Sequence, residues 1–264
     1  MRPDVPTLTT PAAVIFDNDG LLLDTEEAWT RAEQTLFAGL GREFTIEHKR
    51  TLIGSSRSMA AVKLEAILER PGEGEALMDE LHERVMQEAL QGVAPRPGAL
   101  ALLARLRGAG VPLAAASNSE REFLERTLAG AGLLHDGPFA AVVSANDIEH
   151  PKPAPDIYLE ACARLGVEAS RAAALEDSPI GVASAAAAGM FVIGVPYFPG
   201  TPIPGASLLA DSLADLAVGR ALGLPDAGAK KVFQNGGLWV GVLNLRGVSP
   251  TIGGRGGALS IRDQ

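Results

Sequence analysis

The sequence is poor in cysteine, in lysine and in long apolar runs. Cys162 is the single cysteine among 264 residues, which excludes an internal disulfide and a cysteine-based zinc site and is typical of an intracellular protein. The most apolar stretch, residues 182–195, is shorter than the ~20 residues that a membrane-spanning helix needs. Residues 1–11 lack the basic and apolar parts of a signal peptide. We therefore expect a cytoplasmic protein.

Positive charge is scarce as well. The chain has 32 acidic and 23 basic side chains, a formal net charge of -9 and no run of basic residues. This balance repels nucleic acid and anionic lipid, so we expect neither nucleic acid nor a membrane as a partner. The composition, 47% hydrophobic and 21% charged, is typical of a globular chain that is long enough for one large domain or two smaller ones.

Five short apolar runs predict strands that are buried on both faces of a parallel sheet. None of them alternates between apolar and polar residues as a half-exposed strand does. Helical patterns separate the later runs, and this alternation predicts a doubly wound α/β domain. The predicted strands are residues 13–16, 111–116, 139–143, 172–175 and 191–195, and the helices between the later strands are residues 120–131, 155–165 and 179–188, with a further helix at 99–109.

The long interval between the first two predicted strands contains helical patterns only, at residues 26–40, 58–68 and 75–90. We expect an all-helical domain inserted after the first strand, with hinges at 24–25 and at 95–98, where two prolines and a glycine oppose a helix. The predicted domains are a core of residues 11–25 and 95–222, a helical domain of residues 26–94, and a glycine-rich tail of residues 223–264 with a candidate strand at 238–245.

Two of the predicted strands end in paired acids. Asp17 and Asp19 follow the first strand and precede Gly20, while Glu176 and Asp177 follow the fourth. Neighbouring carboxylates are costly unless a cation or a proton neutralises one of them, and Mg²⁺ is a hard cation that prefers oxygen ligands. A solvated turn after the first strand and a helix cap after the fourth remain open as alternatives.

Two further segments carry groups that bind anions. Ser117 and Asn118 follow the second strand and precede a helix, where a hydroxyl and main-chain N–H groups form an anion site. Lys152 lies between two prolines in a chain with only 5 lysines. A plain helix cap at Ser119 and a chance lysine are the alternatives. Because each motif follows a different strand, a parallel sheet brings all four to one edge, where a metal and a phosphoryl group would be bound together.

The four motifs, in this order, resemble those of the haloacid dehalogenase (HAD) superfamily over residues 12–220. The helical insertion is similar to the C1 cap of the subgroup with β-phosphoglucomutase and small sugar-phosphate phosphatases. The resemblance implies a Rossmann-like HAD core with an inserted all-helical cap. It also implies that Asp17 is the nucleophile and that Asp19 is the general acid and base, and the presence of Asp19 argues against a true dehalogenase. The implied phosphate-binding residues are Ser117, Asn118 and Lys152, and the implied Mg²⁺ ligands are Asp17, Asp19 through its main-chain carbonyl, Glu176 and Asp177.

The resemblance implies a function as well. We expect a Mg²⁺-dependent phosphatase that hydrolyses small phosphorylated metabolites, sugar phosphates in particular, through an aspartyl-phosphate, and that is a monomer or a weak homodimer. Arg57, in the segment that matches the cap loop, is the candidate for a distal substrate group, with an exposed surface arginine as the alternative. A phosphomutase of the β-phosphoglucomutase type is the rival, although Trp29 stands where such mutases have a histidine. A phospho-accepting or non-catalytic binding module is the alternative from another class.

Overall fold

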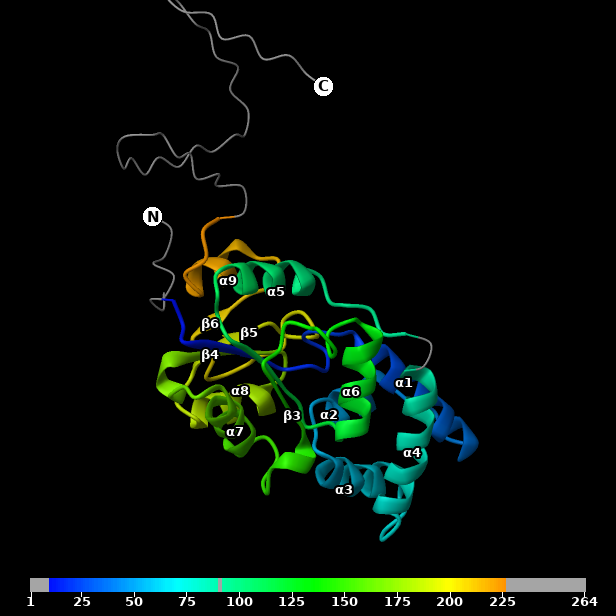
Figure 1. Ribbon diagram of the computed structural model, residues 1–264. Helices are drawn as coiled ribbons and strands as arrows, with labels where there is room; N and C mark the ends of the chain where they lie inside the picture. Colours follow the sequence, from blue (N-terminus) through cyan, green and yellow to red (C-terminus); the bar gives the residue numbers. More distant parts are fainter. Residues whose placement is uncertain (1–9, 90–91, 227–264) are drawn as a thin grey trace, which may run out of the picture. The chain divides into compact units, whose positions relative to one another are not determined.

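A six-stranded parallel sheet lies at the centre of the computed structural model, which describes residues 10–89 and 92–226 (Figure 1). The strand order is β3-β2-β1-β4-β5-β6, and neighbouring strands pair in parallel. The predicted doubly wound α/β fold is confirmed. The strands are β1 (Ala13–Phe16), β2 (Leu113–Ala116), β3 (Ala141–Val143), β4 (Ala172–Glu176), β5 (Phe191–Gly194) and β6 (Leu208–Leu209). Strand β6 was not predicted, because two residues are too short for a sequence pattern.

Both faces of the sheet are covered by helices. On β1, Val14 and Phe16 belong to the apolar cluster on one face, while Ala13 and Ile15 belong to the cluster on the other, as the two-residue period of a strand requires. Both faces are therefore apolar, which explains why the strands lack alternation in the sequence. The first face packs against α5 (Ala99–Gly108), α6 (Arg121–Gly130) and α9 (Leu216–Ala221), and the second against α7 (Asp156–Leu165) and α8 (Pro179–Ala187) (Figure 1).

Four helices form an insertion between β1 and α5, which we call the helical insertion. They are α1 (Thr25–Gly39), α2 (Ile46–Leu52), α3 (Arg57–Leu68) and α4 (Gly74–Ala89). Helix α2 was not predicted; it has seven residues and is capped at its start by Thr45, which accepts a hydrogen bond from the N–H of His48. The insertion buries an apolar cluster of its own, which includes Leu36 and Leu64 and also takes in Phe123 from α6. The division into a core and a cap domain stays a prediction.

The two segments that join the insertion to the sheet lie side by side. The Asp24 N–H donates to the Ala94 carbonyl at 2.8 Å, and the Arg96 N–H donates to the Leu22 carbonyl at the same distance. The Asp24 carboxylate also pairs with the Arg96 guanidinium at 3.6 Å. Hydrogen bonds and an ion pair therefore join the two predicted hinge segments. Their motion stays a prediction.

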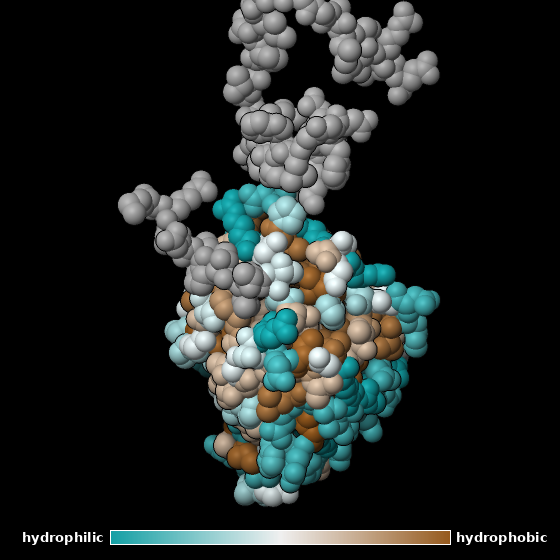
Figure 2. All heavy atoms as spheres, turned by 60° about the vertical axis from the view of Figure 1, so that its left-hand side comes forward, coloured by the Kyte–Doolittle hydropathy of each residue, from teal (hydrophilic) through white to brown (hydrophobic). Residues whose placement is uncertain are grey.

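The surface of the described residues mixes polar and apolar side chains. The large exposed hydrophobic residues lie on different elements, and Figure 2 shows hydrophobic residues dispersed among hydrophilic ones on the face it displays. None of the helices in the described ranges is long and apolar enough to cross a membrane. The candidate strand at 238–245 and most of the predicted tail lie outside the described residues.

Candidate active site

Asp17 lies at the carboxyl end of β1, in the middle of the sheet. Its N–H donates to the carbonyl of Leu175 on β4 at 3.0 Å, so the strand pairing continues one residue beyond β1 and fixes the position of the Asp17 main chain. From β1 the strand order runs outward in both directions, to β2 on one side and β4 on the other. Open α/β sheets bind ligands at such a reversal point, outside the carboxyl ends of the strands.

The ammonium of Lys152 connects the first and fourth motifs. Its Nζ lies 2.5 Å from Asp17 Oδ1, 2.6 Å from Glu176 Oε1 and 3.0 Å from the carbonyl of Ala116. These three acceptors use its three N–H donors. Tyr158 donates its hydroxyl to the same Glu176 oxygen at 2.5 Å. Lys152 and Asp17 are both buried, so this is a desolvated ion pair that depends on all of its partners.

The carboxylates of this cluster repel one another. Asp17, Glu176 and Asp177 each place an oxygen within 4.8 Å of the others. Burial raises the pKa of Asp17 well above its ordinary value, since the opposing effect of Lys152 does not compensate for it. Burial also raises the pKa of Asp177, and the charges of Asp17 and Glu176 add to this effect. The pKa of Lys152 is raised by the two carboxylates that it pairs with, despite its burial. The cluster therefore favours additional positive charge, from protons or from a cation.

Asp19 is held by two serine hydroxyls. Ser117 Oγ donates to Asp19 Oδ2 at 2.5 Å, and Ser119 Oγ donates to the same oxygen at 2.8 Å. The alternative role of Ser119 as a helix cap is wrong, because α6 begins two residues later, at Arg121, and its N-cap is Glu120. Sequence reasoning therefore missed Ser119 as a site residue. Its spacing from Ser117 was the available signal, since the hydroxyls of residues two apart can reach one acceptor.

Asn118 positions Lys152. Its Oδ1 accepts the main-chain N–H of Lys152 at 2.9 Å, and its Nδ2 donates to the Lys152 carbonyl at 3.3 Å. These two hydrogen bonds fix the backbone that carries the lysine, and they occupy the side-chain amide of Asn118. A contact between Asn118 and phosphate, as the sequence predicts, would therefore come from its main-chain N–H.

Asp177 is placed by the turn at Gly20 and by the start of α8. Gly20 has a φ of 80°, and a Cβ at this position would lie 2.3 Å from Asp177 Oδ2. Only glycine satisfies both conditions without displacing the carboxylate. Ser178 is the N-cap of α8, accepting the N–H of Gly181 at 3.1 Å, and Pro179 occupies the first turn. Helix capping by Ser178 is therefore compatible with the predicted site role of Asp177.

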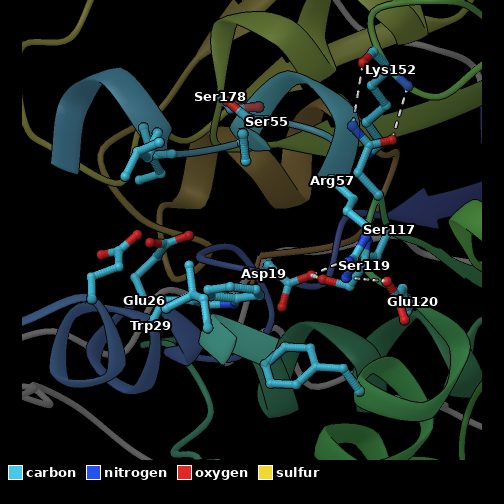
Figure 3. A pocket seen from close by; sticks show the side chains of 18 of the residues that line it. Asp19, Glu26, Trp29, Ser55, Arg57, Ser117, Ser119, Glu120, Lys152 and Ser178 are labelled. Carbon is cyan, nitrogen blue, oxygen red and sulfur yellow. Dashed lines mark hydrogen bonds and ion pairs between the residues drawn. The ribbon is translucent and has the colours of Figure 1, made fainter. Parts of the chain in front are cut away.

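A pocket opens above these groups and continues under the helical insertion. Its empty volume, including the open mouth, is about 930 Å³. Seven of the predicted site residues line it, and Glu176 does not, since it is fully buried behind Lys152. Figure 3 shows Asp19 with Ser117 and Ser119 on one side, and Glu26 and Trp29 of the insertion nearby. The site residues in the lining are Asp17, Asp19, Arg57, Ser117, Asn118, Lys152 and Asp177.

Three buried charges from the insertion also line the pocket. Lys49 of α2 pairs with Glu26 of α1 at 2.5 Å and with Glu33 of α1 at 3.1 Å. Burial raises the pKa of Glu33 to about 7, with Lys49 opposing the shift. Sequence reasoning missed this triad. Lys49 is one of only 5 lysines, so the scarcity that drew attention to Lys152 was an available signal here too.

Arg57 lies on the insertion side of the pocket and is surrounded by carboxylates. Its guanidinium pairs with Asp79 at 2.6 Å and with Glu75 at 3.2 Å, both on α4. It also pairs with Glu120, at the start of α6, at 3.2 Å. The structure therefore places Arg57 in the pocket, as its predicted role requires, with its charge already paired on three sides.

The part of the chain that carries these motifs matches a known family. A family model described as haloacid dehalogenase-like hydrolase matches residues 14–195. The chain belongs to this family. The expectation of a HAD-superfamily hydrolase is thereby confirmed.

Relatives in the family include phosphatases. The fructose-1-phosphate phosphatase YqaB of Escherichia coli (strain K12) is 33% identical over 184 residues, covering 70% of this chain and 96% of the relative. CbbY from Rhodobacter sphaeroides, solved as a mutant with xylulose-(1,5)bisphosphate, is 30% identical with a TM-score of 0.68, covering 78% of this chain and 96% of CbbY. A β-phosphoglucomutase from Clostridium difficile has a TM-score of 0.70, 22% identity and coverage of 78% and 93%, and supports the fold alone.

Proposed function

We propose that the protein is a Mg²⁺-dependent phosphatase of small phosphorylated metabolites, sugar phosphates in particular. The observation that carries the proposal is the meeting of Asp17, Asp19, Lys152 and Asp177 at one edge of the sheet, lining one pocket. This set supplies a nucleophile, an acid, a cation and a metal ligand within reach of one phosphoryl group. The phosphatase relative that covers most of the chain supports the same reaction class.

Asp17 is the proposed nucleophile. One of its carboxylate oxygens forms a bond to phosphorus while the bond from phosphorus to the ester oxygen breaks, which gives an aspartyl-phosphate. Lys152 holds Asp17 Oδ1 at 2.5 Å and thereby fixes the orientation of the carboxylate. The lysine also offsets charge on the phosphoryl oxygens, and Ser117 and Asn118 line the same pocket.

Asp19 is the proposed general acid and base. Its proton goes to the oxygen of the departing alcohol, and in the second step the carboxylate accepts a proton from the water that attacks the aspartyl-phosphate. Ser117 and Ser119 both donate to Asp19 Oδ2, so Oδ1 is the oxygen that faces the reaction, with only a bond of 3.1 Å from Asn18 Nδ2 to displace.

The acidic cluster fits Mg²⁺. Three buried carboxylates face a single ammonium, and the space next to Asp177 exists only because Gly20 has no side chain. Asp17 and Asp177 are the proposed ligands, together with the Asp19 carbonyl. Both oxygens of Glu176 already accept hydrogen bonds, Oε1 from Lys152 and Tyr158 and Oε2 from the Asp177 N–H. Among the expected Mg²⁺ ligands, Glu176 is therefore the one least suited to bind the ion directly. Bound Mg²⁺ would offset the charge of the phosphate dianion and orient it toward Asp17.

Hydrolysis is preferred to phosphomutase chemistry because of Trp29. The indole lines the pocket and packs edge-to-face on Phe123, with ring centroids 5.5 Å apart. A mutase must transfer the phosphoryl group back to a second hydroxyl of the sugar, and Trp29 offers no group that moves a proton from that hydroxyl.

Hydrolysis of an aryl phosphate by the purified protein tests the proposal. We expect phosphate release with Mg²⁺, loss of activity with a chelator and its return on adding Mg²⁺. Asp17→Asn should abolish turnover while the protein stays folded by circular dichroism. Substantial residual activity in this variant would contradict the assignment of the nucleophile, and interconversion of glucose 1-phosphate and glucose 6-phosphate would favour the mutase.

A further inference from the structure

The part of the pocket under the helical insertion is rich in carboxylates. In the described lining, Glu26, Glu33 and Glu120 surround this end, and its cations are Lys49 and Arg57. Lys49 is buried and already bridges Glu26 and Glu33. Arg57 is bound by Glu120 and by two exposed carboxylates of α4. Both cations are therefore already paired with carboxylates where the distal end of a substrate would lie.

This end has acceptors for hydroxyl groups. Glu26 and Glu33 each use Oε2 for Lys49, and among the described residues no donor reaches the Oε1 atom of either. Both side chains line the pocket, and neither Oε1 atom is a fully buried polar atom without a partner. A carboxylate oxygen accepts a hydroxyl proton well. Glu26 and Glu33 are about two turns apart on α1, but both reach Lys49 Nζ, so their carboxylates lie close enough to bind hydroxyls of one polyol.

The same end has an apolar wall. Trp29 and Phe123 form an edge-to-face pair beside the carboxylates, and Leu81 of α4 lines the pocket with them. Figure 3 shows Trp29 next to Glu26, with Asp19 beyond it. An aromatic face next to hydroxyl acceptors suits a molecule with C–H groups on one side and hydroxyls on the other.

We propose that this end of the pocket selects monophosphates of neutral polyols and rejects substrates with a second anionic group. The inference rests on the proposed function and names its substrate class. A second phosphate would need unpaired arginine or lysine groups, whereas Arg57 is paired with three carboxylates and Lys49 with two. This narrows the expected role of Arg57 as a contact for a distal substrate group to an uncharged group, because its guanidinium is already paired with Glu120.

Matched substrates test the selection. Fructose 1-phosphate and fructose 1,6-bisphosphate differ only in the second phosphate, and we expect kcat/KM to be about 100-fold higher for the monophosphate, since like charges brought together across a site repel each other. Equal or better use of the bisphosphate, in a protein that hydrolyses aryl phosphate, would overturn the inference and leave the proposed function intact. No hydrolysis of aryl phosphate by the wild type with Mg²⁺ would instead refute the proposed function.

Variants assign the selection to residues. Glu120→Gln removes the charge of one carboxylate that pairs with Arg57. The ratio of kcat/KM for the bisphosphate to that for the monophosphate should then rise about tenfold, because one negative charge fewer repels the second phosphate at short range. Glu122→Gln is the matched control, because Glu122 is exposed on the same helix and pairs with Arg126 outside the pocket; its ratio should equal that of the wild type. An unchanged ratio in Glu120→Gln would contradict the charge argument.

A substrate without hydroxyls tests the acceptors separately. Glu26→Gln should lower kcat/KM for fructose 1-phosphate by about tenfold, the loss expected for a hydrogen bond to a charged group, and should change that for butyl phosphate much less. A similar loss for both substrates would show that Glu26 has no part in recognising hydroxyls.

Discussion

Glu33→Gln should make the protein more resistant to heat at neutral pH, because Glu33 is a buried acid whose charge is poorly compensated. Burial raises its pKa from 4.5 to about 7, although Lys49 lies 3.1 Å away. A pKa that is raised in the folded state means that the neutral acid is favoured. Protonated Glu33 therefore stabilises the folded protein fully below pH 4.5, and this stabilisation is lost as the pH rises to about 7.

The size of the effect follows from the shift. At about 1.4 kcal/mol for each pKa unit, the ionised Glu33 costs the wild type about 3 kcal/mol that the glutamine variant does not lose. For a protein of this size that corresponds to about 6–12 °C in Tm. The difference in Tm, variant minus wild type, should therefore rise by this amount between pH 5 and pH 8.

Thermal unfolding followed by circular dichroism at several pH values is the assay. Glu43→Gln is the control, since Glu43 belongs to the same insertion and is exposed; its Tm should follow that of the wild type throughout. A Tm difference for Glu33→Gln that is constant from pH 5 to pH 8, or that falls as the pH rises, would refute the reasoning.

Three further substitutions test the site. Lys152→Met leaves the buried carboxylates without their ammonium and should lower the free energy of unfolding by about 3–5 kcal/mol, as measured by urea denaturation, with part of it recovered by Mg²⁺. Ser119→Ala removes one of two hydroxyl donors to Asp19 and should lower kcat about tenfold with little change in KM, as measured by steady-state kinetics. Gly20→Ala places a Cβ 2.3 Å from Asp177 Oδ2, so Mg²⁺ affinity should fall, as measured by calorimetric titration.

Each of these has a result that would contradict it. A Lys152→Met protein as stable as the wild type would show that the carboxylates are neutralised by protons. A rise in KM alone for Ser119→Ala would indicate that the hydroxyl binds substrate. Unchanged Mg²⁺ affinity in Gly20→Ala would place the ion away from Asp177.

Much of the fold and the chemistry could be predicted from the sequence. The apolar runs that became β1 and β4 are continuous because both of their faces are covered. Acidic residues interrupt the apolar pattern at the end of each run, which made them easy to recognise. Pairing of β1 with β4 then brings Asp17 and Asp177 together. Elements with few residues were missed: α2, α9 and β6 are too short for a period to be seen.

The sequence by itself determined that the four motifs meet at one edge of the sheet, because a parallel sheet aligns the carboxyl ends of its strands. Only the tertiary structure decided what those residues and their neighbours contact. It assigned Ser119 to Asp19 instead of the helix end, and the amide of Asn118 to the Lys152 backbone. It also paired Arg57 with Glu120. These contacts join segments far apart in the chain, and local sequence patterns carry no information on which distant side chains meet when the helical insertion packs against the sheet.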